Sequence, residues 1–157
     1  ETIPDFKDLK IEIKNHCEIY VRKFLHIKKT ANFYFQNSWS NLHKPKEYSQ
    51  IHYHGNSLIS GVYYPILPKN SGDISFHRGH TYTNLFHQSI RFDYDKTNFV
   101  TTDQYVLNLK EGSITLFPSH LDHRVEENNS NEYRYSIAFN FYVRGKFGAH
   151  EYELEIK

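Results

Sequence analysis

The chain has 157 residues, and 19 Lys and Arg against 18 Asp and Glu leave a formal net charge of +1. This length predicts one domain with a single hydrophobic core. No long basic run is present to grip a phosphate backbone, so the charge balance argues against a nucleic-acid partner. No apolar stretch approaches the roughly 18 residues that a membrane span needs, and no secretory signal is visible, so we expect no membrane partner.

Cysteine and methionine usage bear on the origin of the chain. The single cysteine, Cys17, excludes a disulfide within the chain, so we expect a reducing compartment. The chain contains no methionine, not even at position 1, which predicts a processed or excised fragment whose N-terminal piece is missing.

The first segment predicts a helix over about residues 5–29. Asp5 follows a proline and is suited to cap the helix N-terminus. Because Cys17 lies among the apolar positions, we expect it to fill space in the core rather than act as a nucleophile. These positions recur every three or four residues and form a core-facing stripe: Phe6, Leu9, Ile13, Cys17, Tyr20, Phe24 and Ile27.

The rest of the chain, about residues 31–157, predicts β-strands. Short aromatic and β-branched runs alternate with turn sequences. Eight or nine strands at this spacing favour a sandwich or jelly roll. The expected strands are Asn32–Trp39, Tyr48–His54, Leu58–Leu67, Asp73–His77, Phe99–Leu109, Ser113–Pro118, Arg124–Glu127, Tyr133–Arg144 and, more weakly, Tyr152–Ile156.

Two further stretches need an interpretation. Arg78–Asn98 has no clean period and is long for a plain connection, so we expect a lid or binding loop there. Asn128-Asn129-Ser130 matches a glycosylation sequence, but without a secretory signal we regard the match as accidental. No repeat or domain boundary is visible, so residues 1–157 are expected to form one domain.

Histidines are numerous, and imidazole is a common transition-metal ligand. His52 and His54 share one face of an expected strand, while Tyr53 points away. Alone this pair is uninformative, because 11 histidines in 157 residues give roughly one His-x-His pair by chance. His123, at the start of a later strand, is a third candidate ligand, although a structural role is more common there. His120, three residues earlier, competes with it.

The last long strand carries Arg134 and Ser136. Together with Ala138 and Asn140 they form a small, polar face, whereas the other face is aromatic and apolar. If the polar face points into a sandwich, the arginine fork and the serine hydroxyl are suited to grip a carboxylate. The alternative is an outer face, where the arginine meets water and the aromatic side chains are the buried ones.

The order of these blocks resembles the Fe(II)/2-oxoglutarate-dependent dioxygenases. That superfamily has a His-x-Asp/Glu pair, a distal histidine and then an arginine, often as Arg-x-Ser, that binds the far carboxylate of 2-oxoglutarate. The similarity is closer to the small 2-oxoglutarate–Fe(II) oxygenases of marine bacteria and phages. It covers about residues 38–144, and its segments are Ser38–Asn41, His52–His54, Ser60–Tyr64, Gly112–Ser119, His123 and Arg134–Asn140.

The resemblance implies a mainly β protein, a double-stranded β-helix (a cupin-like jelly roll) with an N-terminal α-helix. It also implies an oxygenase that uses Fe(II), 2-oxoglutarate and O2, with ascorbate as an accessory reductant, and that hydroxylates an unidentified small molecule or protein. We expect a cytoplasmic protein, or a phage-encoded one that acts in the host cytoplasm, and a homodimer is compatible with the sequence. The implied metal ligands are His52, His54 and His123, and the implied co-substrate residues are Arg134, Ser136, Tyr64 and Asn41.

One position departs from the superfamily pattern. Position 54, usually a carboxylate, is histidine, so three neutral imidazoles would leave the metal its full formal charge of +2. Asp73 and Asp122 are competing carboxylate ligands, although Asp122 adjoins His123 and would need a bulge to reach the same face. A further alternative is a two-His site, in which His54 only donates to a backbone carbonyl at the strand end. Two other functions stay open: a three-His cupin-type dioxygenase or isomerase that does not use 2-oxoglutarate, and a metal-free β-sandwich binding module.

Overall fold

The protein is mainly β, with two antiparallel sheets and one N-terminal helix, as the sequence predicts. The computed structural model describes residues 6–78, 93–98, 101–148 and 150–157. Helix α1 (Lys7–Ile19) continues as a π-helical turn over Tyr20–Phe24. The strands are β1 (Ala31–His43), β2 (Ile59–Ile66), β3 (Ile74–His77), β4 (Gln104–Leu107), β5 (Ile114–Pro118), β6 (Asp122–Val125), β7 (Arg134–Phe147) and β8 (Leu154–Ile156), with a short 3-10 helix at His150–Tyr152.

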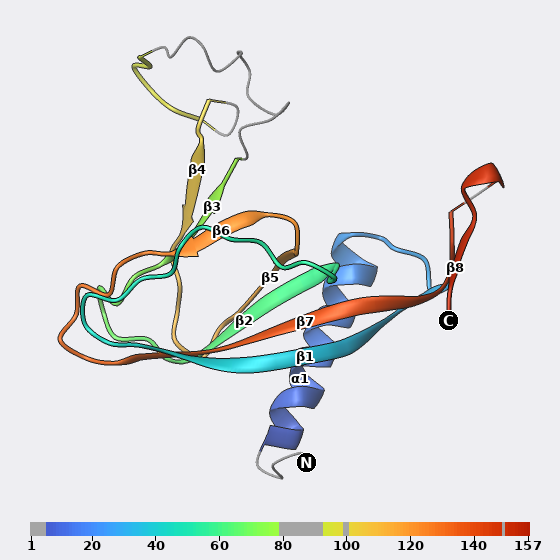
Figure 1. Ribbon diagram of the computed structural model, residues 1–157, viewed down its shortest axis with the longest axis horizontal. Coiled ribbons are helices and arrows are strands. Elements are labelled where there is room, and N and C mark those ends of the chain that lie inside the picture. The colour runs from blue at the N-terminus through green and yellow to red at the C-terminus, as the bar shows by residue number, and fades with distance from the viewer. Residues whose placement is uncertain (1–5, 79–92, 99–100, 149) are drawn as a thin grey trace.

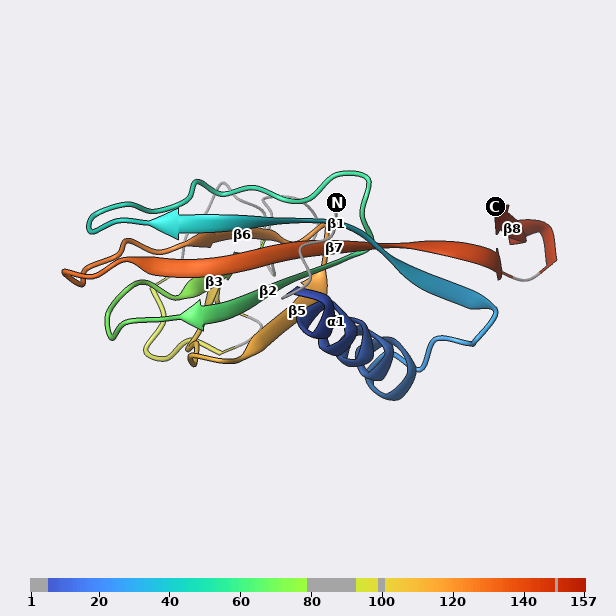
Figure 2. The same cartoon turned by 90° about the horizontal axis from the view of Figure 1, so that it is seen from below.

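The two sheets enclose the interior of the protein. The major sheet has the order β1-β7-β2-β5, with β8 paired to the far end of β7, and the minor sheet has the order β4-β3-β6. Helix α1 lies against one face of the major sheet (Figure 2), and β3 and β4 extend away on the opposite side (Figure 1). The ring of Phe117 on β5 contacts Phe76 on β3, with ring centroids 5.0 Å apart, which joins the two sheets on that opposite side.

The helix-side core forms on the aromatic face of β7. Phe139 and Phe141 are buried there against Ile13 and Cys17 of α1, and Ile59 of β2 completes the cluster. Cys17 is 1% exposed, and its burial raises the pKa of the thiol to about 12. Cys17 therefore fills space in the core, as predicted, and is not a nucleophile.

A bulge in β1 divides that strand into two halves that use opposite faces. The β1–β7 register shifts between Phe35 and Asn37. Before the shift, Phe35 packs on the helix-side core. One extra residue moves every later side chain to the other face. Asn37, Trp39, Asn41 and His43 consequently stand beside the polar face of β7, opposite Asn140, Ala138, Ser136 and Arg134 in turn.

The helix departs from the predicted apolar stripe at its end. Phe24, expected in the core, is 72% exposed, whereas Val21 is fully buried. The cause is the π-helical turn, in which Leu25 N–H donates to the Tyr20 carbonyl at 2.9 Å. Such i→i+5 bonds widen each turn and rotate the later side chains away from the α-helical stripe. The proposed cap, Asp5, lies outside the described residues.

The expected strand Tyr48–His54 was a wrong prediction. The segment makes a single isolated bridge, between His52 and His123, in which each N–H donates to the other's carbonyl at 2.9 Å. Its apolar residues Ile51 and Tyr53 are exposed. No face of the segment is buried, so nothing fixes a continuous ladder.

Three remaining sequence features can be placed. Asn128 is fully buried, and its amide donates to the carbonyls of His43 and Glu132, which is a structural role. The predicted lid Arg78–Asn98 falls mostly outside the described residues. Within the part that the structure describes, no helix has the length and apolar character to cross a membrane.

Replacing Gly61 on β2 tests the packing of the helix-side core. A Cβ atom there would overlap the buried ring of Phe139 and would lie 2.7 Å from Leu116 Cδ2. We expect Gly61→Ala to lower the free energy of unfolding by about 1–3 kcal/mol through overpacking. Gly55→Ala is the matched control, because no atom lies within 4 Å of its added Cβ. Equal urea midpoints for the two variants would contradict this packing.

Candidate metal centre

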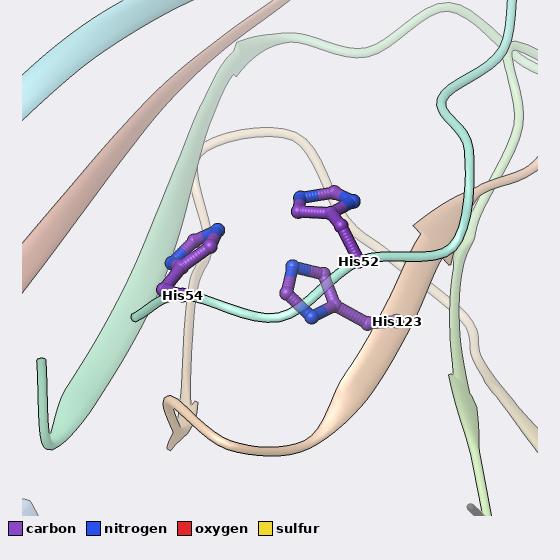
Figure 3. Close-up of side chains that lie close together, drawn as sticks. All are labelled: His52, His54 and His123. Atoms are coloured by element: carbon purple, nitrogen blue, oxygen red, sulfur yellow. The ribbon is translucent and has the colours of Figure 1, made fainter. Parts of the chain in front are cut away.

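Three histidines from two chain segments meet between the sheets. His123 lies on β6, and the bridge between its backbone and His52 brings the 52–54 segment alongside. His54 follows two residues later, and its N–H donates to the Ser119 carbonyl at 2.9 Å. One ring nitrogen of each histidine lies within 4.8 Å of the other two. Figure 3 shows the three rings converging on one space.

Backbone carbonyls fix the tautomers of two of these histidines. His52 Nδ1 lies 2.8 Å from the Gln50 carbonyl, and His123 Nδ1 lies 2.8 Å from the Leu121 carbonyl. A carbonyl only accepts, so in each ring Nδ1 carries the proton and donates it. The Nε2 lone pair of each ring is thereby left for a metal ion.

The third histidine is held by a buried network of neutral side chains. His54 Nδ1 lies 2.9 Å from Asn140 Oδ1 and 2.7 Å from Ser60 Oγ. The Ser60 hydroxyl also donates to Asn140 Oδ1 at 2.8 Å and contacts Ser119 Oγ at 2.8 Å. Ser119 in turn donates to Ser57 Oγ at 2.9 Å. The network directs Nε2 of His54 toward the cluster.

Burial keeps the cluster ready to bind a cation. Burial is the main cause that lowers the pKa of His123 to about 4. The hydrogen bond to Leu121 opposes this shift, and the positive charge that His52 and His54 can carry contributes to it. Burial also lowers the pKa of His54. Only neutral imidazole binds a metal, so His123 is available at neutral pH and is lost to protonation only as the pH falls toward 4.

The competing ligands predicted from the sequence lie elsewhere. His120 is exposed and outside the cluster. Asp122 and His123 are successive residues of β6 and pair with successive residues of β3. The Asp122 side chain therefore leaves the strand on the face opposite His123. The Asp73 carboxylate accepts a hydrogen bond from Leu109 N–H at 2.9 Å. Among the described residues, the cluster therefore contains three imidazoles and no carboxylate.

Aromatic rings surround the cluster. Phe117 lies 4.7 Å from His123 and Trp39 lies 5.4 Å from His54, measured between ring centroids. Phe117 is buried, whereas Trp39 is 38% exposed. The cluster thus has an apolar inner wall and a partly open outer side, an arrangement that lowers the local dielectric while leaving access.

Arg134 forms a second polar site on the same face of the major sheet. It is fully buried, so the alternative of a solvent-facing arginine was wrong. None of its three guanidinium nitrogens has a hydrogen-bond partner among the described residues, and its Cζ lies 5.4 Å from the centre of the Tyr64 ring. An unpaired buried charge is costly and calls for an anion.

Tyr64 lies beside this guanidinium, and Ser136 and Asn41 lie on the same face of the major sheet. Burial raises the pKa of the Tyr64 phenol to about 12, and Arg134 and Thr115 oppose that rise. Thr115 lies close enough to affect this pKa. The buried phenol oxygen nevertheless makes no well-formed hydrogen bond with any described residue. Ser136 is 3% exposed, and Asn41 is directly opposite it across the β1–β7 pair. Cross-strand partners share a face, so Asn41 and Ser136 lie on the face that carries Arg134, beside which the Tyr64 ring lies.

Sequence reasoning missed two residues that lie at these sites. Asn140, which accepts from His54, lies on the β7 face that also carries Arg134, so strand alternation could have indicated it. His43, the direct neighbour of Arg134 in the register, could not be found this way. The bulge in β1 reverses the alternation before the chain reaches it.

The comparisons with known proteins agree with this geometry. A family described as "Putative 2OG-Fe(II) oxygenase" matches residues 37–140, which contain all three histidines and the buried arginine. The chain therefore belongs to this 2-oxoglutarate- and Fe(II)-dependent oxygenase family. A search of curated proteins found no match.

Solved structures show the same fold. An oxidoreductase of the 2OG-Fe(II) oxygenase family from Burkholderia pseudomallei matches with a TM-score of 0.53 and 12% identity, over 73% of this chain and 46% of that one. A prolyl-4-hydroxylase from Pseudomonas putida matches with a TM-score of 0.50 and 14% identity, over 84% and 63%. EvdO2 from Micromonospora carbonacea var. aurantiaca matches with a TM-score of 0.55 and 14% identity, over 99% and 68%.

These similarities define a double-stranded β-helix, the jelly roll that the sequence predicts. At 12–14% identity they carry the fold alone. The chain spans 46% to 63% of the length of the first three solved structures that it matches.

The contact between His54 and Asn140 predicts an effect on metal affinity. Asn140→Leu keeps the approximate size of the side chain but removes the acceptor, so His54 loses its orientation. We expect a loss of about 10–100-fold in Co(II) affinity, measured by competitive titration. Asn140→Asp is the matched control, because it retains an acceptor, and it should bind within a few-fold of the unsubstituted protein. Unchanged Co(II) affinity in a folded Asn140→Leu protein would contradict the role of this network.

Proposed function

We propose that this chain is an Fe(II)- and 2-oxoglutarate-dependent oxygenase that hydroxylates a small molecule or a protein, with His52, His54 and His123 as the metal ligands. One observation carries the proposal: the fully buried guanidinium of Arg134, without a partner among the described residues, lies on the same sheet face as the network that holds His54. A metal-binding set of imidazoles and an anion-binding arginine are together what a keto-dicarboxylate co-substrate on a metal requires.

The donor set fits a ferrous ion. Imidazole nitrogens suit Fe(II) among other divalent metals, and carbonyl and amide acceptors behind each ring hold it in the metal-binding tautomer. Three protein ligands leave further coordination positions open for co-substrate and O2. When bound, Fe(II) supplies the activation of O2, with ascorbate as a reductant that keeps it ferrous.

The chain's own residues position the co-substrate. Arg134 offers a planar fork of N–H donors that matches a carboxylate, with the Ser136 hydroxyl two residues away on the same face. The phenol of Tyr64 and the amide of Asn41 add donors at the rim. A bound carboxylate would supply the hydrogen-bonded anion that the guanidinium lacks among the described residues, so binding offsets part of the cost of burying it.

Histidine at position 54 changes the charge of the centre. Three neutral ligands leave the metal a formal charge of +2, whereas a carboxylate would reduce it to +1. His54 therefore makes the centre more attractive to an anionic co-substrate. The network around it consists of an amide and hydroxyl groups, which suits a neutral ring.

The rival three-His dioxygenase that does not use 2-oxoglutarate explains the ligands but not the arginine. Such an enzyme would gain nothing from a buried, unpaired guanidinium at Arg134. The arginine thus favours the 2-oxoglutarate reaction. We also propose that residues 1–157 form a single domain.

The assignment of the distal ligand can be tested by exchanging neighbouring histidines. His123→Ala should lose stoichiometric Fe(II) under anaerobic conditions, because it removes a buried ligand from the cluster. His120→Ala is the matched control and should keep the ion, since its side chain is exposed and outside the cluster. The opposite pattern, with iron lost only from His120→Ala, would overturn the assignment.

The role of Arg134 predicts separate effects on co-substrate and metal. Arg134→Met should weaken 2-oxoglutarate binding by roughly 2–5 kcal/mol, because the buried carboxylate loses its counter-charge. Iron binding should survive, as the ligands are unchanged. Arg144→Met, an exposed position on the same strand, serves as the control. Calorimetry under anaerobic conditions measures both affinities, and an unchanged 2-oxoglutarate affinity would eliminate this role.

A further inference from the structure

A second basic side chain reaches the space around Arg134. His43, the last residue of β1, is the direct partner of Arg134, the first residue of β7. Because the bulge after Phe35 turns this half of β1 toward the polar face, both side chains leave the sheet on the same side. Nδ1 of His43 is buried and has no hydrogen-bond partner among the described residues.

Hydrogen bonds hold the end of β1, so the position of His43 is fixed. Asn128, itself fully buried, donates from its side-chain amide to the His43 carbonyl at 3.1 Å. The next turn is closed by Glu47, whose carboxylate accepts from the Lys44 N–H at 2.8 Å. Unpaired polar atoms on His43, Arg134 and Tyr64 are therefore held together in the interior, which is costly unless a ligand satisfies them.

Charged groups of both signs act on His43 and on Arg134. Burial and the positive charge of Arg134 lower the pKa of His43, and Glu47 raises it. Asp73 acts on Arg134 and on Tyr64. Among the described residues, the ionisable groups that act on His43 or on its neighbour Arg134 are Arg134 itself on β7, Glu47 in the turn, Tyr64 and Asp73. The imidazole is neutral here, since two adjacent buried cations would repel.

We propose that His43 is a further co-substrate-binding residue, which donates a hydrogen bond to the carboxylate that Arg134 holds and takes up a proton when that carboxylate binds. The inference rests on the proposed function and deepens it, because it adds a titratable group to the co-substrate site. The proton goes to a ring nitrogen of His43 from solvent, and no bond of the co-substrate changes.

The sign of the pH dependence follows from the charges. A bound carboxylate cancels the repulsion by Arg134 and adds an attraction, so it raises the pKa of His43 above its value in the free protein. Between those two pKa values, binding takes up a proton. The affinity for 2-oxoglutarate should therefore rise as the pH falls through this window and become level below it.

The experiment is anaerobic calorimetry of 2-oxoglutarate binding to the protein loaded with Mn(II), which occupies the three metal-site histidines. Titrations in buffers of different ionisation enthalpy give the number of protons taken up. His43→Leu removes the donor and the titrating group, His43→Gln keeps a donor that does not titrate, and His16→Gln changes an exposed histidine of α1 as the control.

We expect proton uptake in the unsubstituted protein and in His16→Gln, and none in His43→Gln or His43→Leu. The affinity of His43→Leu should fall by about 10–100-fold, the usual loss for a hydrogen bond to a charged group, and His43→Gln should recover part of it. Proton uptake that persists in His43→Gln, or full affinity in His43→Leu, would overturn the role of His43.

The same titrations separate this inference from the function on which it rests. If the unsubstituted, Mn(II)-loaded protein binds 2-oxoglutarate and Arg134→Met does not, while the His43 variants behave normally, only the role of His43 fails. If the unsubstituted protein does not bind 2-oxoglutarate at all, the proposed function fails. Circular dichroism of each variant confirms that a lost affinity does not reflect a lost fold.

Discussion

A buried positive charge that makes no hydrogen bond to the described residues lies in the interior of this protein, and the organisation of the site depends on it. Arg134 is fully buried, and no described side chain satisfies its guanidinium. Leaving such a charge unpaired costs several kcal/mol, a large share of the stability of a domain this size. A fold that carries this cost gains from an anionic ligand, so binding at this position and stability are coupled.

Strand β7 connects that charge to the rest of the molecule. Its aromatic side chains Phe139 and Phe141 form the core beneath α1, and its alternate side chains Arg134 and Asn140 face the interior between the sheets. The helix-side core therefore fixes the strand that carries Arg134, and Asn140 on the same strand holds the ring of His54 through a hydrogen bond. Packing on one face and chemistry on the other are two consequences of the period-two geometry of one strand.

Regular alternation explains what could be predicted from the sequence. It places Arg134 and Ser136 on one face of β7, and it puts His52 and His54 on one side even though the structure has a single bridge there instead of a strand. Irregularities of one residue explain what was missed. The π-helical turn moved Phe24 into solvent, and the bulge after Phe35 brought His43 beside Arg134. Neither leaves a signal in the hydrophobic periodicity, because each is defined by backbone hydrogen bonds.

We propose that three imidazoles and no protein carboxylate hold the metal beside an arginine-bound co-substrate. A crystal structure of the anaerobic complex with Fe(II) and 2-oxoglutarate tests it most directly. The account predicts Nε2 of His52, His54 and His123 at about 2.0–2.3 Å from the ion, typical of metal–imidazole bonds, and one carboxylate of 2-oxoglutarate on the guanidinium of Arg134. An imidazole of His54 turned away from the ion, with Asp73 or Asp122 in its place, would contradict it.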